Sequence, residues 1–105
     1  QSFISYPLRI VYLSDTGDNI PASGISVLIG VPKKRIRRAA QRNRIKRLIR
    51  EAFRLNKNEL SNLYKQESKH LLVAFMYVCN EAKAYTNIEK SILKAFTIIR
   101  QKENL

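Results

Sequence analysis

Apolar and polar residues alternate with a period of two in two stretches near the start of the chain. Pro7–Leu13 and Gly24–Val31 each place apolar residues at every second position, many of them aromatic or β-branched, and this pattern indicates β-strands. Between them, Ser14–Ser23 is rich in Asp, Gly, Asn and Pro, the residue types that form turns. We therefore expect two strands joined by a loop.

The period changes to that of a helix after Pro32. Apolar residues recur at spacings of three and four and form one stripe, made of Ile45, Leu48, Ile49, Ala52 and Phe53. Such a stripe is typical of an amphipathic helix, which we expect to begin around Gln41. Leu60, Leu63 and Tyr64 predict a further short helix before a polar stretch.

The last third of the chain predicts a strand and a helix. Leu71–Cys79 is apolar at every position, as expected for an interior strand of a sheet that is covered on both faces. Thr86 and Glu89 have the spacing of a capping box. A stripe at helical spacing follows and predicts a C-terminal amphipathic helix; it consists of Ile88, Ile92, Ala95, Phe96 and Ile99.

These elements predict one α+β domain, a two-layer α/β sandwich spanning residues 1–105. Their order is strand, strand, helix, short helix, strand and helix, which places helices on a small mixed sheet. The chain has 105 residues, 45% of them hydrophobic, enough for one core and too few for two domains by the usual size range.

Several functional classes are excluded by composition. The nine-residue run at Leu71–Cys79 is far shorter than the roughly 20 residues that cross a bilayer, and the first residues do not resemble a secretory signal. We expect a cytoplasmic protein. His70 and Cys79 are the only histidine and cysteine, so no triad or zinc site can form, and we expect Cys79 to be buried. Asp15 and Asp18 fit turn chemistry better than metal binding. We therefore expect neither catalytic nor metal-ligating residues in this chain.

Positive charge is concentrated in one segment. The formal net charge is +12, and Lys33–Arg54 holds eleven of the 20 Lys and Arg residues but only one of the eight Asp and Glu residues. Arginine outnumbers lysine there, and its planar guanidinium pairs with phosphate in a bidentate fashion. A polyanion is therefore the expected partner.

On a helical projection the charges of this segment divide by position. Lys46, Arg47, Arg50, Arg54 and Asn43 fall opposite the apolar stripe, whereas Arg38 and Arg42 fall above it, where we expect them to be exposed at the helix start. Cations near a helix start oppose the macrodipole, and no Ser, Thr, Asp or Asn cap is evident. An external anion would supply the missing counter-charge. The predicted RNA-binding residues are Arg38, Arg42, Asn43, Arg44, Lys46, Arg47, Arg50 and Arg54.

Within this segment, Arg42–Arg54 closely resembles the RNR motif of the bacterial ribonuclease P protein family. The predicted element order agrees with that family along essentially the whole chain. The resemblance implies a fold similar to the second domain of ribosomal protein S5, with a left-handed crossover through the motif helix, although most crossovers are right-handed. It also implies that the motif contacts the catalytic RNA of ribonuclease P, which removes the 5′ leader of precursor tRNA.

The resemblance carries further expectations about partners and chemistry. Ribonuclease P RNA and precursor tRNA are the implied partners, with no obligate protein partner, and magnesium is expected with the RNA rather than on protein ligands. In the family, a cleft between the sheet and an N-terminal helix holds the single-stranded leader, and Tyr12 is the matching candidate here. The sequence starts almost at the first strand, so we expect the domain to lack that helix. The Gly-Asn-containing turn common before the motif is replaced by Lys34–Ala40.

Three other functions remain open at the level of sequence. The first is a ribosomal or RNA-assembly protein of similar fold with no role in cleavage. The second is a DNA-binding domain, although arginines spread over more than half of a helix circumference suit phosphate contact better than base readout. The third is binding to anionic membranes, which would need exposed apolar residues opposite the basic face. In this chain, the apolar stripe opposite the basic face is needed for the core.

Overall fold

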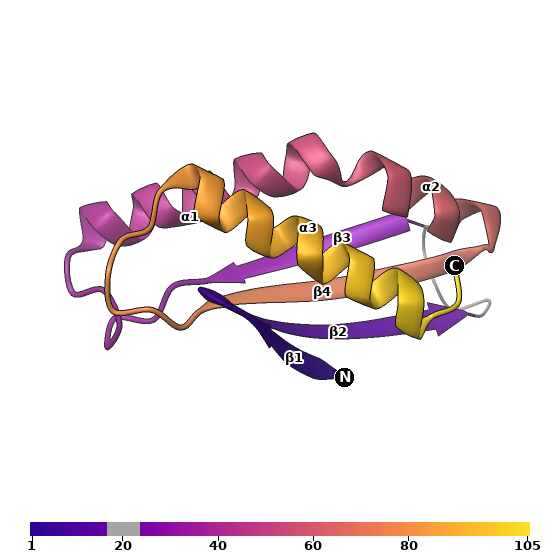
Figure 1. Cartoon of the computed structure of the whole chain (residues 1–105), viewed down its shortest axis with the longest axis horizontal. Coiled ribbons are helices and arrows are strands. Elements are labelled where there is room, and N and C mark those ends of the chain that lie inside the picture. Colours follow the sequence, from indigo (N-terminus) through magenta and orange to yellow (C-terminus); the bar gives the residue numbers. More distant parts are fainter. Residues whose placement is uncertain (17–23) are drawn as a thin grey trace.

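The computed structural model describes residues 1–16 and 24–105 of the chain as one two-layer α+β domain. In Figure 1 the helices lie together on one face of the sheet, as predicted. No helix in these two ranges is long and apolar enough to cross a membrane. The elements in chain order are β1 (Ser2–Ser5), β2 (Leu8–Thr16), β3 (Gly24–Gly30), α1 (Ala39–Asn56), α2 (Asn58–Gln66), β4 (Lys69–Tyr77) and α3 (Tyr85–Lys102).

The sheet is mixed, as predicted, with strand order β1-β2-β4-β3. Strand β2 pairs with β1 and β4 in antiparallel fashion, whereas β3 is parallel to β4. A parallel pair needs a crossover connection, and here α1 and α2 form it together. The motif helix α1 is therefore the first part of the connection that leads from β3 to its parallel neighbour β4.

The N-terminal part of the sheet is larger than the sequence predicted. Strand β1 was not foreseen, because four residues that include two serines give little alternation; only Phe3 and Ser5 point toward the helices. Strand β2 also continues through Ser14, Asp15 and Thr16, where we had placed the loop. These residues pair with the start of β4. The rest of the predicted loop lies outside the described residues.

The expectation that both faces of β4 are covered is wrong. Toward the helices, Leu71 and Phe75 are fully buried, but on the other face Leu72 and Met76 are 39% and 37% exposed. Beside them, Leu13 of β2 and Leu28 of β3 are about 60% exposed. The strand is interior because it has neighbours on both edges, and only one layer of helices covers the sheet.

The apolar stripes of α1 and α3 meet the covered face of the sheet. Ile45, Ile49 and Phe53 of α1 are buried as predicted. Phe53 makes edge-on contacts with Phe75 of β4 and Phe96 of α3, with ring centroids 6.1 Å apart in both pairs. Aromatic pairs of this geometry add to the stabilisation from burial. One aromatic cluster therefore joins the motif helix to the sheet and to the C-terminal helix.

The predicted capping box at the start of α3 is wrong. The helix begins at Tyr85, with Ala84 at the N-cap in extended conformation and no side-chain cap hydrogen bond. Because the helix starts one residue before Thr86, that hydroxyl is not at the cap position. The Glu89 carboxylate instead accepts hydrogen bonds from Tyr85 and Asn56.

Candidate nucleic-acid interface

The outward face of α1 carries the residues that the helical projection placed there. Asn43, Arg47, Arg50 and Arg54 are exposed, as is Arg44 at the edge of this face. Lys46 is half-buried. Long cationic side chains can bury their methylene stems while the charged group stays in water. The structure thus brings these six residues onto one side of a helix that is fixed by its buried face.

The first turn of α1 has no internal compensation for its positive charge. Arg38 is the N-cap residue, makes no side-chain cap hydrogen bond and is exposed, and no acidic residue occurs in the first turn. The amide groups that begin a helix carry partial positive charge and favour anions. Both the backbone and the side chains at this position therefore favour a bound phosphate.

Arg42 does not have the exposed position that we expected. It is half-buried, and its Nη1 donates hydrogen bonds to the carbonyl oxygens of Ile36 and Arg37, at 3.1 and 2.7 Å. The residue lies above the apolar stripe, as the helical projection indicated, but the loop before the helix folds over that position because Ile36 is buried in the core. Arg42 therefore holds the loop in addition to presenting charge.

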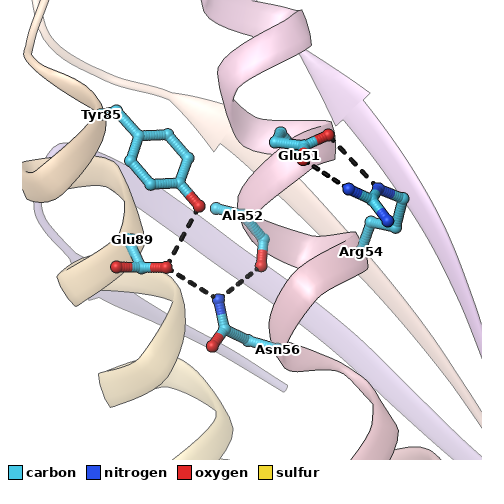
Figure 2. Close-up of polar contacts among 6 residues, drawn as sticks. All are labelled: Glu51, Ala52, Arg54, Asn56, Tyr85 and Glu89. Atoms are coloured by element: carbon cyan, nitrogen blue, oxygen red, sulfur yellow. Dashed lines mark hydrogen bonds and ion pairs between the residues drawn. The ribbon is translucent and has the colours of Figure 1, made fainter.

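The end of α1 is compensated by acidic groups, unlike its start. Arg54 forms an ion pair with Glu51, at 2.5 Å, and the hydrogen bond from Arg54 holds the pKa of the Glu51 carboxyl below its usual value. Figure 2 shows the network next to this pair. Asn56 Nδ2 donates to the Ala52 carbonyl oxygen at 2.8 Å and to Glu89 at 3.1 Å. The Tyr85 hydroxyl lies 3.1 Å from the same carboxylate. Helix α1 is thereby linked to α3.

A groove of about 240 Å³ lies between the start of α1 and the loop before α3, and we refer to it as the motif groove. Arg44 and Lys83 line it from opposite sides, with Ile45 and Leu48 also in its wall. Sequence reasoning missed Lys83, because nothing in a local pattern shows that the loop after β4 returns to α1. The parallel pairing of β3 and β4 brings these segments to one end of the sheet.

Tyr12, the candidate for the leader cleft, lies in the core. Its side chain points toward the helices, is 2% exposed, and makes an edge-on contact with Phe3 at 6.1 Å between ring centroids. Burial also raises the pKa of its hydroxyl. No face of the ring is free to stack on a base. The alternation of β2 instead presents Val11 and Leu13 on the uncovered side of the sheet.

The described residues hold no group of three or more His, Cys, Asp or Glu side chains that could bind a metal ion. Cys79 is buried, as expected, and its Sγ accepts a hydrogen bond from the backbone amide of Glu81 at 3.4 Å.

Comparisons with known proteins show the family to which the chain is similar. A family model described as Ribonuclease P matches residues 1–100. The ribonuclease P protein component of Porphyromonas gingivalis is 41% identical over 95 residues, which cover 90% of this chain and 68% of that protein. That of Clostridium kluyveri is 34% identical and covers 81% of this chain and 68% of its own length.

A solved structure shows the same fold. The ribonuclease P protein of Staphylococcus aureus superposes with a TM-score of 0.66 at 22% identity, covering 95% of this chain and 81% of that one. The similarity of the fold, the match of the family model over nearly the whole chain and the identity to two relatives lead to one assignment. This chain belongs to the ribonuclease P protein family.

Proposed function

We propose that this chain is the protein component of ribonuclease P and that the outward face of α1 binds the RNA of that enzyme. The observation that carries the proposal is the start of α1, where the arginines are exposed, the amides lack a side-chain cap and the first turn contains no acidic residue. The family match favours this function over a ribosomal or RNA-assembly role.

In the proposed complex the chain binds and orients RNA and does not itself cleave it. Arginines along α1 pair with phosphates, and each contact displaces counterions from the RNA. The chemistry of hydrolysis is assigned to the RNA with bound magnesium. By neutralising phosphates, the protein reduces the concentration of magnesium that the folded RNA needs.

The proposed substrate is precursor tRNA, whose 5′ leader is removed. Because the Tyr12 ring is buried, contacts with the leader fall to surfaces that are exposed in the structure. The motif groove is one such surface, since Arg44 and Lys83 approach it from two elements.

A reconstitution experiment tests the proposal. Adding the protein to its cognate ribonuclease P RNA should lower the magnesium concentration needed to cleave precursor tRNA. Replacing Arg44, Lys46 and Arg47 together by Ala should remove that effect and reduce the slope of log affinity against log salt by about 0.7–0.9 for each lost phosphate contact.

The matched control replaces three lysines elsewhere on the surface by Ala, namely Lys65, Lys69 and Lys102. The control removes the same charge but no proposed contact, so it should retain most of the affinity. Equal loss in both triple variants would show that binding depends on net charge alone. Absence of any effect of the unmodified protein on cleavage and on RNA affinity would overturn the proposed function.

A further inference from the structure

A second basic groove, which we call the lysine groove, lies on the side of α3 that faces β1. Its volume is about 420 Å³, larger than that of the motif groove. Helix α3 contacts α1 on one flank and β1 on the other. The lysine groove is therefore separated from the outward face of α1 by the body of α3.

The lining of the lysine groove comes mostly from one stripe of α3. Asn87, Lys90, Ser91 and Lys94 recur at spacings of three and four, so they share one side of the helix. Lys90 and Lys94 are one turn apart, about 6 Å along the axis. A polyanionic backbone that runs along α3 would meet their two ammonium groups in succession.

Aromatic surface is presented beside these charges. Tyr6 follows β1, lines the groove and is 61% exposed. The Nζ of Lys83 lies 5.9 Å from the centroid of its ring. A large exposed aromatic side chain among cations is the combination that binds single-stranded nucleic acid, because bases stack on the ring and phosphates pair with the cations.

Hydrogen bonds join the segments that form the floor of the lysine groove. Ser5 and Ser91 are both buried, and each hydroxyl donates a hydrogen bond to the backbone carbonyl of the other residue, with a distance of 2.8 Å from Ser5 Oγ to the Ser91 oxygen. This reciprocal pair fixes β1 against α3 directly beside Tyr6. The backbone amide of Lys83 is likewise held, since it donates to the buried Tyr77 hydroxyl at 3.0 Å.

The lysines of the groove form no ion pair with any acidic residue that the structure describes. The ion pairs found over residues 1–16 and 24–105 are Arg54–Glu51 and Arg100–Glu59, and neither includes a lysine of this groove. The described lining of the groove contains no Asp or Glu. Like charges four residues apart destabilise a helix slightly. An external anion bound between Lys90 and Lys94 would reduce this repulsion.

From this geometry we infer that the lysine groove binds a single-stranded segment of RNA, with phosphates on Lys90 and Lys94 and a base on Tyr6. Lys83 lines both grooves, so one strand can pass from the start of α1 to α3. The inference rests on the proposed function, because it assigns the lysine groove to a further segment of the same RNA partners. The segment comes either from the precursor tRNA leader or from ribonuclease P RNA itself.

The test uses a groove variant, Lys90→Gln with Lys94→Gln, and a control, Lys65→Gln with Lys102→Gln. Affinity is measured against salt for ribonuclease P RNA alone, and then for the assembled enzyme with precursor tRNA and with the same tRNA lacking its leader. We expect the groove variant to lower the log-log slope by about 1.4, the value for two contacts with a single strand.

The pattern of loss identifies the source of the strand. Loss confined to precursor tRNA with its leader assigns the groove to the leader, and loss with ribonuclease P RNA alone assigns it to that RNA. Behaviour equal to the control with all three RNAs would overturn the inference. The proposed function fails separately, if the unmodified protein binds none of these RNAs.

Tyr6 provides an independent measurement. Tyr6→Ala should weaken binding of the same RNA by about tenfold, the typical effect of removing one stacked base contact. Tyr6→Phe retains the ring and should bind like the unmodified protein. Equal affinities for all three proteins would contradict base stacking in the groove. The lysine variants, which alter exposed side chains only, decide the matter if Tyr6→Ala does not fold.

Discussion

The two ends of α1 differ in how their charge is balanced. At the end of the helix, Glu51 pairs with Arg54, and Glu89 of α3 accepts a hydrogen bond from Asn56. At the start, Arg38 and Arg44 are exposed and no acidic residue occurs in the first turn. Acidic groups are thus placed where the helix is joined to the rest of the fold. The start of the helix, which lacks acidic groups, is the part that we propose binds RNA.

The largest effect on stability should come from removing the hydrogen bonds that link α3 to the compensated end of α1. Glu89→Ala removes the acceptor of the half-buried Tyr85 hydroxyl and one of the two acceptors of Asn56 Nδ2, which keeps its bond to the Ala52 carbonyl oxygen, so we expect a loss of about 1–3 kcal/mol in the free energy of unfolding. Urea denaturation measures this loss. The control is Glu67→Ala, at an exposed carboxylate after α2, and an equal loss there would show that the network contributes nothing specific.

A somewhat smaller effect is expected at the uncompensated end. Arg42→Ala should lower the free energy of unfolding by about 1 kcal/mol, because the carbonyls of Ile36 and Arg37 lose their donor, and it should also weaken RNA binding. Arg38→Ala should weaken RNA binding alone, since that side chain is exposed and makes no cap hydrogen bond. Paired denaturation and binding measurements separate the two. Unchanged stability of Arg42→Ala would contradict its role in holding the loop.

Alkaline pH should act on the loop near the start of α1. Burial raises the pKa of Tyr77 to about 12, and its hydroxyl donates to the Glu81 carbonyl oxygen at 2.5 Å while accepting from Lys83. Since the unfolded state releases this proton near pH 10, the stabilisation is complete below pH 10 and falls as pH rises toward 12. Tyr77→Phe should flatten this part of the stability profile, as followed by thermal denaturation. An unchanged slope would assign the pH dependence to other tyrosines.

The smallest effect is expected for the ion pair at the exposed surface. Glu51→Gln should leave stability almost unchanged, because surface pairs contribute little. RNA affinity should rise slightly at low salt, since the Arg54 guanidinium loses its acidic partner. A fall in affinity would show that Arg54 must be held by Glu51 in order to bind. The control is Glu67→Gln, which removes the same negative charge at an exposed position after α2, away from this face.

Local sequence patterns predicted the elements better than they predicted what lies between them. The spacing of Ile45, Ile49 and Phe53 determined the buried face of α1, and the outward positions of the basic residues followed from it. Arg42 could not be placed in this way, because its partners are carbonyls of a loop with no periodic pattern. Tyr12 was assigned by resemblance, and only the pairing of β1 with β2 and the cover of α3 show that it is buried.

The lysine groove was also beyond a reading of the sequence. Lys90 and Lys94 look like the solvated side of any amphipathic helix, and Tyr6 lies 84 positions before Lys90 in the chain. They become a site only because Ser5 and Ser91 fix β1 against α3. Long-range pairing of this kind leaves no periodic signal along the chain.

The position of β4 in the sheet also has a consequence for the order in which the protein is made. This strand pairs with both β2 and β3, yet it follows α1 and α2 in the chain, and Phe96 follows later still. While synthesis proceeds from the N-terminus, the emerging motif helix has no sheet on which to bury Phe53 until Phe75 has been added. The basic face of α1 therefore acquires its final orientation only after β4 and α3 have been synthesised.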